Sequence, residues 1–444
     1  MAEVIPLRGI LYNPRKIKKM GDVITPPFDV ISKKDQHQFY ERSPFNVVRL
    51  ILGKTSVFDT RGHNPHSRAA DYFNNWMADD ILRQDALPTF YLTAFEFPSD
   101  DRRVTRYGLI ARVRLSPFSD GIILPHERTF TNVKSERLAL MRLCHANFSP
   151  IFSMYSDGDG SLHGYLTGIS ADATADIDFR DHQGNRHKLW RITASDVLER
   201  ISAELETKKL YIADGHHRYE TALNYRNWLR ASDPKFHASH PANFVLMYLC
   251  SMNDPGLIIR PAHRLLKQVP KSALDSLISK ARDFFEVISI PFKENERNKI
   301  LYEFSNMLNS ESPKISIGVF IKRRREFFIF RLTQPQIMED LFGRELDPVL
   351  RDLDVTVLTR LIFMELLGFD QARLDNEKLI GYTTDVKEAV DEVVRGKYDA
   401  AFILNPTGVQ QVRNIADHGL VMPRKATYFY PKVTTGLVMN RLDE

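Results

Sequence analysis

The amino-acid sequence predicts a mixed α/β protein, with antiparallel hairpins too frequent for a purely parallel sheet. The first observation is a pair of strand-like runs, Thr89–Phe97 and Thr105–Leu115, which are separated by a short polar turn. A second hairpin is expected between Ile177–Phe179 and Leu189–Ile192. The other observation is the helical spacing of apolar residues between such runs, as in Ser67–Met77, which predicts helices that pack on the strands.

The order of the expected elements divides the chain in two. In residues 1–268 the hairpins are followed by a helix through about Glu206, which the capping box Thr193–Asp196 is expected to open. From residue 269 the pattern becomes helix, strand, helix and hairpin, and an amphipathic helix is expected later at Asp354–Leu367. We therefore expect an N-terminal region, residues 1–268, and a C-terminal mixed α/β domain, residues 269–444.

The composition is that of a globular protein. Apolar residues make up 43% of the 444 residues and charged residues 26%, which excludes a disordered tail, a collagen and a coiled coil. The net charge of +5 is a small surplus over a long chain. The basic run Lys322–Arg325 falls in an expected hairpin turn, and we interpret it as solvated. Nucleic acid is therefore not an expected partner.

Two features indicate the cellular setting. The chain has two cysteines, Cys144 and Cys250, so no disulfide framework is expected, and both are interpreted as buried apolar residues. The N-terminus lacks the apolar stretch of a signal peptide, and runs such as Phe244–Cys250 are far shorter than the ~20 residues that span a bilayer. We expect a soluble, cytoplasmic protein with no membrane partner.

The sharpest chemical signal is a short apolar strand that ends in Asp214 and Gly215, after which a helix begins with His216, His217 and Arg218. Glycine permits the tight turn. The free N–H groups of the first helical turn and the helix dipole favour an anion there, most often phosphate. The guanidinium adds a planar fork for phosphate oxygens, and the imidazoles can donate hydrogen bonds. The alternative is that the aspartate caps the helix and the histidines are surface residues, but so many polar residues at one junction favour a binding site.

The second signal is the loop 124–129, in which His126, Glu127, Arg128 and Thr129 follow an apolar run and a proline. A lone glutamate is usually only solvated. Because this one lies between an imidazole and a guanidinium at the start of an exposed loop, we interpret it as functional.

A helix is expected directly after this loop. It would open near Lys134 and end at about Leu143, so its basic residues could reach the same place. Taken individually, Lys134 and Arg137 are interpreted as a solvated helix start.

Over essentially its whole length the chain resembles the bacterial and archaeal domain-of-unknown-function family 1015. The motifs that carry this resemblance are Thr25–Ile31, the His126–Glu127 loop, Asn147–Phe152, Asp214–Arg218 and Asp354–Thr356. The name of this family implies no activity.

A narrower resemblance does imply an activity. Pro125-His126-Glu127, followed by an Asp-Gly-His-His-Arg turn at 214–218, is similar to the free L-serine kinases built on the ParB/sulfiredoxin-like fold. The resemblance implies a ParB/sulfiredoxin-like nucleotide-binding core with inserted hairpins. It also implies that the turn cradles nucleotide phosphates and that the glutamate helps to deprotonate the serine hydroxyl.

Carried over to this chain, the resemblance makes Gly215, His216, His217 and Arg218 the phosphate-binding residues, with Glu127 as the base. Asp214 would be the second catalytic residue. The chain departs from the small kinases in spacing, because 87 residues (214 − 127) separate the two motifs, so that a hairpin and a helix must be inserted.

The leading hypothesis is therefore a phosphotransferase that uses ATP or ADP with Mg²⁺ and acts on a small hydroxylated metabolite, with free L-serine as the named candidate. No metal-binding set of protein residues is part of this hypothesis. Further residues that could line the substrate pocket are His126, Arg128, Thr129, Asp29 in the rigid turn after two prolines, and Arg264 after a strand.

Two other classes of function compete with it. The first is a metal-dependent hydrolase in which His126, Glu127, Asp214 and either His216 or His217 bind zinc or manganese. The second is a non-catalytic nucleotide-sensing or DNA-associated protein that uses the turn as a switch, for which salt-sensitive DNA binding would be the sign.

Overall fold

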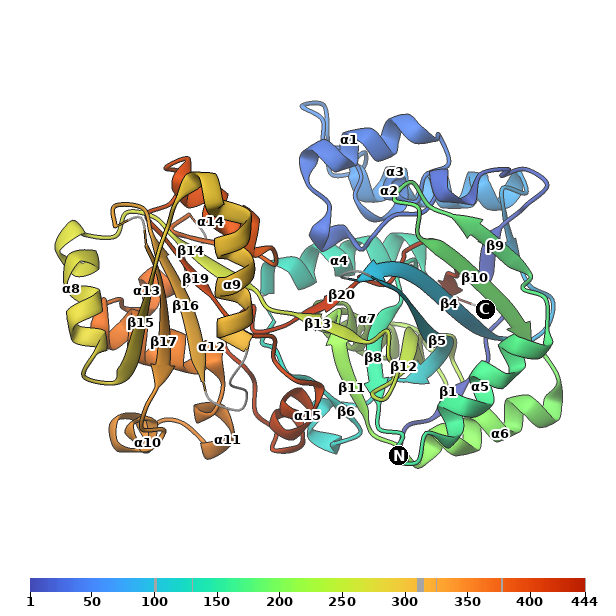
Figure 1. Ribbon diagram of the computed structural model, residues 1–444. Coiled ribbons are helices and arrows are strands. Elements are labelled where there is room, and N and C mark those ends of the chain that lie inside the picture. Colours follow the sequence, from blue (N-terminus) through green and yellow to red (C-terminus); the bar gives the residue numbers. More distant parts are fainter. Residues whose placement is uncertain (100–101, 130, 310–314, 325, 377, 444) are drawn as a thin grey trace. The chain divides into compact units, whose positions relative to one another are not determined.

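The computed structural model describes residues 1–99, 102–129, 131–309, 315–324, 326–376 and 378–443. The chain forms two compact units. The first contains Met1–Ile258 and also Pro431–Glu444, and the second contains Ile259–Tyr430. Each unit has a β-sheet of its own (Figure 1).

The described part of the first unit contains a mixed sheet of nine strands, in the order β6-β11-β8-β12-β5-β4-β10-β9, with β1 paired to β5. The pairs β11/β6 and β12/β8 are parallel, and the other pairs are antiparallel. The strands are β1 (Val4–Ile5), β4 (Phe90–Ser99), β5 (Arg102–Arg114), β6 (Ile123–Leu124), β8 (Ile151–Tyr155), β9 (Ile177–Arg180), β10 (Arg186–Ile192), β11 (Leu210–Asp214) and β12 (Phe244–Ser251).

Both expected hairpins are present in this sheet. β4 pairs with β5 from Tyr91 opposite Ile110 to Ser99 opposite Arg102, and residues 100 and 101 of the turn lie outside the described residues. β9 pairs with β10. The mixed α/β class with frequent antiparallel hairpins is thus confirmed.

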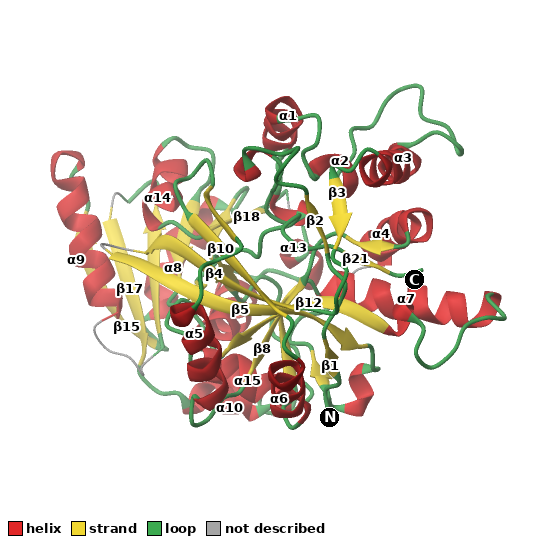
Figure 2. Cartoon of the chain, turned by 90° about the vertical axis from the view of Figure 1, so that its right-hand side faces the viewer, coloured by secondary structure: helices red, strands yellow, loops and turns green. Residues whose placement is uncertain are grey.

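The burial of each strand follows its place in the sheet. β8, β11 and β12 are buried at every position, whereas β9, at the edge, alternates between half-buried and exposed residues. Near-continuous apolar runs are expected where a strand is covered on both faces. One face packs against Leu162 and Leu166 of α5 and Ile201 and Leu205 of α6. Figure 2 shows these two helices on the opposite side of the strands from α1–α3.

The helices of this unit follow the apolar periodicity of the sequence, and some of them also begin at a side-chain cap. The helix expected at Ser67–Met77 begins earlier, because Asn64 caps it and a proline occupies its first turn. The helices are α1 (Lys33–Arg42), α2 (Val48–Ile51), α3 (Pro65–Ala78), α4 (Thr131–Cys144), α5 (Ser161–Asp172), α6 (Ser195–Glu206) and α7 (His216–Ser232).

The capping box expected at Thr193–Asp196 is wrong. The N-cap of α6 is Ala194, whose side chain cannot accept a hydrogen bond, and no side chain caps the helix. The helix forms at the expected place nonetheless, because Ile201 and Leu205 on its apolar face are completely buried.

A second apolar cluster joins α2, α3 and α4 to two short ribbons. One ribbon pairs β2 (Ile10–Tyr12) with β3 (Leu82–Gln84), and the other pairs β7 (Ala146–Asn147) with β21 (Asn440–Arg441). α4 also packs against α7, so this cluster borders the helix that follows β11.

Residues Pro431–Glu444, which we call the returning segment, belong to the first unit although some 170 residues of the second unit precede them in the chain. Besides β21, the segment forms antiparallel bridges from Thr435 to Thr25 and from Met439 to Ile10. Its apolar side chains, Val433, Leu437, Val438, Met439 and Leu442, are buried. It is therefore an integral part of the first unit.

The second unit contains an antiparallel sheet in the order β15-β17-β16-β19-β14-β18. Its strands are β14 (His263–Leu266), β15 (Phe285–Pro291), β16 (Ser316–Ile321), β17 (Glu326–Leu332), β18 (Ile380–Thr383) and β19 (Ala400–Ile403), and a separate ribbon pairs β13 (Ile258–Arg260) with β20 (Tyr428–Tyr430). Its helices are α8 (Lys271–Ala281), α9 (Arg297–Asn309), α10 (Gln336–Phe342), α11 (Pro348–Arg351), α12 (Asp354–Val357), α13 (Gln371–Leu374), α14 (Val386–Val394) and α15 (Val409–Asp417).

Two expectations for this unit are refined by the structure. The helix expected at Asp354–Leu367 is present, but it continues from α12 as π-helical turns over Leu358–Leu366 before Gly368 ends it at a positive φ of 70°. The hairpin β16/β17 is present, and Arg325 of its basic turn lies outside the described residues.

The structure also divides the chain differently from the expected boundary at residue 268. β14 pairs with β18 and β19, so the second unit begins before that boundary. The returning segment was expected in the C-terminal domain, but its backbone pairs with the first unit.

Within the described residues, no helix is both long and apolar enough to cross a lipid bilayer. Cys144 and Cys250 are buried free thiols, as expected.

Candidate functional site

The site is built on the junction between β11 and α7. β11 ends at Asp214, Gly215 follows with a φ of 96°, and α7 begins at His216. An L side chain at position 215 would be strained at this φ, and its Cβ would lie 2.8 Å from the guanidinium carbon of Arg218. No side chain caps the helix. The strand, turn and helix therefore have the arrangement that the sequence predicted.

Asp214 is the electrostatic centre of this junction. Its Oδ2 accepts a hydrogen bond of 2.6 Å from Nη2 of Arg218, and its Oδ1 pairs with Nζ of Lys432. Burial alone would raise the pKa of Asp214, but the charges of Lys432 and Arg218 outweigh it and hold the pKa at about 2. The carboxylate is therefore charged at neutral pH.

Arg218 connects the turn to the neighbouring strand. Its Nη1 donates to the carbonyl oxygen of Pro150, just before β8, while Nη2 holds Asp214. The guanidinium is thus fixed at the end of two adjacent strands.

His126 and His216 form a buried pair beside the junction. Their ring centroids are 4.7 Å apart and the rings are perpendicular. Burial lowers the pKa of His126 to about 4 and that of His216 well below its usual value, so both are neutral at pH 7. The backbone N–H of His126 donates to Nε2 of His216 over 3.3 Å, which assigns the proton of the His216 ring to Nδ1.

Glu127 lies next to that ring. Its Oε2 is 4.0 Å from Nδ1 of His216, and its side chain is 37% exposed. This distance is longer than a hydrogen bond, and because the ring is neutral it adds no positive charge beside the carboxylate.

The remaining residues of the loop differ in their surroundings. Arg128 is exposed, whereas Thr129 donates a 2.7 Å hydrogen bond to Glu220 on α7. Lys134 pairs with the same glutamate. His217 is half-buried, and its carbonyl oxygen accepts a hydrogen bond from Thr221.

Asp29 also belongs to this group. It is accessible to solvent, but burial and the negative charge of Asp214 raise its pKa, while the charges of Arg218 and Lys432 act in the opposite direction. The two carboxylates and the two cations are therefore close enough to affect one another electrostatically.

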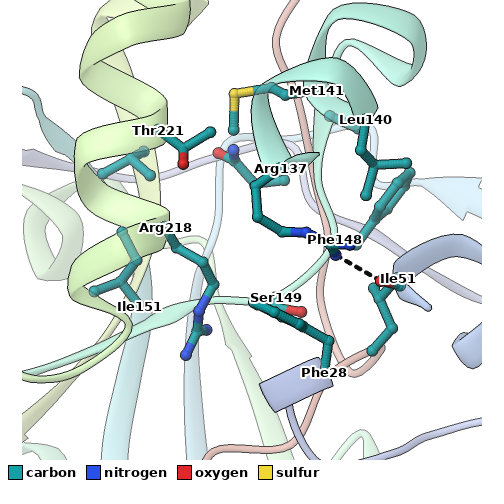
Figure 3. A pocket seen from close by; sticks show the side chains of 13 residues that line it. Phe28, Ile51, Arg137, Leu140, Met141, Phe148, Ser149, Ile151, Arg218 and Thr221 are labelled. Carbon is teal, nitrogen blue, oxygen red and sulfur yellow. Dashed lines mark hydrogen bonds between the residues drawn. The ribbon is translucent and has the colours of Figure 1, made fainter. Parts of the chain in front are cut away.

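A small pocket opens beside Arg218, between α4 and α7 (Figure 3). Its volume is about 60 Å³, and Phe28, Phe148, Ser149 and Thr221 are among the residues that line it. An apolar cavity of about 150 Å³ holds one benzene molecule, so this smaller pocket has room for a group of a few atoms.

Arg137 lines the same pocket, and its interpretation as part of a solvated helix start is wrong. Its side chain is only 8% exposed, and Nη1 donates a 2.6 Å hydrogen bond to the carbonyl oxygen of Ile51 (Figure 3). The guanidinium also lies 4.2 Å from the centre of the Phe28 ring. Because α4 packs inside the second apolar cluster, the residue at this position is covered.

Arg264, which was expected to line the substrate pocket, is held by contacts within its own unit. It lies in β14 of the second unit, where its guanidinium donates hydrogen bonds to the carbonyl oxygens of Ala262 and Arg424. Lys432, in contrast, was not expected at the site. It follows Asp214 by 218 residues, and no motif surrounds it.

The hydrolase hypothesis requires several side chains that together bind a metal ion. In the described ranges, no group of three or more His, Cys, Asp and Glu side chains is placed to hold a metal ion.

The fold and the site together define a mixed α/β protein with a buried strand–turn–helix junction of paired charges. Residues 4–356 match the model of the family described as "Protein of unknown function (DUF1015)". The chain belongs to this family. A comparison with curated proteins gave no match.

Three solved structures illustrate what else the chain is similar to. A conserved hypothetical protein from Pyrococcus furiosus is 12% identical, with a TM-score of 0.32, and the match covers 74% of this chain and 95% of that one. A free serine kinase in complex with AMP is 12% identical, with a TM-score of 0.33 and coverages of 74% and 92%. SbnI with a C-terminal truncation, from Staphylococcus aureus, is 10% identical, with a TM-score of 0.32 and coverages of 72% and 85%. TM-scores this low carry no argument about function.

Proposed function

We propose that the protein is a nucleotide-dependent phosphotransferase that acts on a small hydroxylated metabolite, with free L-serine as the specific candidate. The observation that carries the proposal is the 4.0 Å separation between the Glu127 carboxylate and the His216 ring, on the turn that also bears Arg218. A carboxylate for proton removal and a cradle for phosphate are then adjacent. Phosphoryl transfer requires mainly such positioning and the neutralisation of charge.

The cradle consists of the turn itself. The uncapped N-terminus of α7 offers backbone N–H donors and the positive end of a 17-residue helix dipole. Gly215 lets the backbone approach a ligand closely, and Arg218 adds a fixed guanidinium. These features favour a phosphate group at this position.

Glu127 suits the role of base. Its partial exposure leaves it accessible to a substrate hydroxyl, and the neutral ring of His216 beside it does not form an ion pair with it. Glu127 would take the hydroxyl proton, the resulting oxygen would attack the terminal phosphorus, and the bond to the bridging oxygen would break, with its electron pair leaving on the nucleotide product. The pocket of about 60 Å³ beside Arg218 suits part of a small acceptor.

Mg²⁺ is expected to accompany ATP or ADP. Magnesium sites in such enzymes commonly combine one or two carboxylates with the phosphates of the substrate. Asp29 and Asp214, which interact electrostatically, would hold the ion once Lys432 has left Oδ1 of Asp214. When bound, the ion would neutralise charge on the transferred phosphate.

The hydrogen bonding of His216 bears on the metal-dependent hydrolase. Nε2 of this ring already accepts a hydrogen bond from the backbone N–H of His126, so that its lone pair is occupied. In the hydrolase the histidine ligand would therefore have to be His217 or Nδ1 of His216, whereas the phosphotransferase requires no change at this ring.

In the variant Glu127→Gln we expect phosphate transfer to be lost and nucleotide binding to be kept. An amide cannot accept the proton, so phosphoserine formation from serine and ADP or ATP should fall at least about a hundredfold, as is typical when a general base is lost. Nucleotide affinity, measured by isothermal titration calorimetry, should stay within about twofold of the wild type. Product is measured by mass spectrometry.

The matched control is Glu206→Gln, at an exposed glutamate on α6. It should leave both affinity and transfer unchanged. Full transfer by Glu127→Gln would contradict the assignment of the base. A wild-type protein that binds nucleotide but transfers phosphate to no hydroxylated metabolite would support the non-catalytic alternative.

A further inference from the structure

The returning segment places a cationic side chain at the candidate site, and two side-chain hydrogen bonds hold the segment there. Nη1 of Arg106 donates a 2.7 Å hydrogen bond to the carbonyl oxygen of Pro431, next to Lys432. Oγ1 of Thr435 donates a 2.9 Å hydrogen bond to Oγ of Ser149. The segment lies outside the residues 4–356 that match the family model.

Lys432 shares one carboxylate with Arg218. Its Nζ pairs with Oδ1 of Asp214, while Arg218 takes Oδ2. The side chain of Lys432 is 12% exposed, and that of Arg218 is 11% exposed. Two nearly buried cations thus converge on a single buried carboxylate, at the N-terminus of α7.

The positive charge around Asp214 is greater than its own negative charge requires. Arg218, in the first turn of α7, is by itself close enough to compensate the carboxylate at the end of β11. The additional positive charge lies where the helix dipole also favours an anion. Lysine is a common phosphate ligand, as a compact charge on a flexible stem that can move between partners.

We propose that Lys432 is a phosphate-binding residue of the site, supplied by the returning segment. When a nucleotide binds, the Lys432 ammonium donates to a phosphate oxygen, and Asp214 keeps its hydrogen bond with Arg218. This inference rests on the proposed function in so far as the phosphate is that of a nucleotide.

The test is a comparison of ligand affinities in the full chain. Lys432→Met keeps the length and the apolar stem, and Asp214 still has Arg218 as a partner, so no buried charge is left unpaired. The variant should bind ADP and inorganic pyrophosphate at least about tenfold more weakly by isothermal titration calorimetry. Lys432→Arg should recover much of this loss. The matched control, Arg441→Met, removes the ion pair with Asp443 on the same segment and should bind both ligands like the wild type.

The salt dependence of binding provides a readout that a purely structural role would not change. If Lys432 contacts phosphate, ADP affinity of Lys432→Met should fall less steeply with added salt than that of the wild type. Equal affinities and equal salt dependences in the wild type and Lys432→Met, with only a lowered thermal midpoint, would overturn the inference and leave the proposed function standing. A wild type that binds neither ADP nor pyrophosphate would overturn both.

A second pair of variants covers the case in which Lys432→Met does not fold. Asp214→Asn and Asp214→Asn/Lys432→Met differ only at position 432. Both variants lack the carboxylate with which Lys432 pairs. Weaker pyrophosphate binding by the double variant supports a direct contact between Lys432 and phosphate. Equal binding by the two overturns it.

Discussion

At the scale of single residues, the candidate site depends on groups whose charge state is set by burial. His126 is 2% exposed and His216 is 4% exposed, and water is therefore largely withheld from both rings. The site keeps these imidazoles neutral while it keeps Asp214 charged. The difference arises because Asp214 has two cationic partners, whereas the negative charge of Asp214 does not offset the loss of hydration of the two histidines.

The buried imidazole of His126 predicts a pH dependence of stability. Its pKa is about 4 in the folded protein against an ordinary 6.5, so between these values the unfolded chain binds more protons than the folded one. Stability should therefore fall as the pH is lowered from about 6.5 to about 4, by an amount on the order of 3 kcal/mol from this residue. In His126→Gln the fall over this range should be smaller.

Tryptophan fluorescence can follow this change selectively, because Trp76, Trp190 and Trp228 all lie in the first unit. Urea unfolding curves at several pH values give the stability of that unit. The substitution His63→Gln, at an exposed histidine, is the control. Parallel pH profiles for the wild type and His126→Gln would show that the ring is not held neutral in the folded state.

Some residues of the candidate site could be predicted from the sequence, and others could not. Asp214, Gly215 and Arg218 could be placed, because a strand, a glycine and a helix start are local patterns. Arg137 was misjudged, because its burial depends on the packing of α4 against other helices and not on its neighbours in the chain. Lys432 could not be found, since nothing near it in the sequence indicates a partner 218 residues away.

At the scale of elements, the junction of β11 and α7 depends on one backbone conformation. Gly215 has a φ of 96°, and a Cβ there would also contact the Arg218 guanidinium. Gly215→Ala should therefore lower the free energy of unfolding of the first unit by about 1–2 kcal/mol and weaken nucleotide binding. Urea unfolding monitored by tryptophan fluorescence measures the first effect, and calorimetry with ADP the second.

Gly168→Ala is the matched control for this prediction. Gly168 lies in α5 with no heavy atom within 4 Å of an added Cβ, and its φ is not positive. Alanine there should be neutral or stabilising by up to about 1 kcal/mol, because it favours the helix. If both variants gave the same small effect, the strain assigned to the turn would be absent.

The position of α6 depends little on its cap. The helix lies at the expected place, although Ala194 occupies the N-cap in place of the expected capping box. The buried face of a helix contributes several side chains to its stability, whereas a cap contributes about 1 kcal/mol. An error in the cap therefore did not displace the helix.

At the scale of the whole molecule, the returning segment makes the first unit discontinuous in sequence. Its five buried apolar side chains each contribute roughly 1.5–3 kcal/mol, a sum comparable with the total stability of a domain. Deletion of Pro431–Glu444 should therefore abolish the cooperative thermal transition of the first unit, as followed by tryptophan fluorescence.

Hydrogen exchange can localise this effect. Without the segment, amide protection should be lost at Ile10, Thr25 and β7, whose backbones pair with it, and retained at β16 and β17 of the second unit. An unchanged fluorescence midpoint in the deletion variant would show that the segment only lies on the surface of the unit.

The division into units was only partly accessible from the sequence. A change in the pattern of elements near residue 269 indicated a second unit, and β14 lies just before that change. The return of the chain after Tyr430 could not be anticipated, because short bridges such as that between Thr25 and Thr435 leave no periodic pattern.

The discontinuity of the first unit also has a consequence for biosynthesis. A ribosome that has just completed Asp214 must add 218 further residues before it reaches Lys432. At about 5–20 residues per second this interval is roughly 10–45 s. The core of the nascent first unit stays unfinished for that long, while the second unit is synthesised. The order of translation thus makes the charged junction one of the last places to mature, and chaperone dependence should reflect this delay.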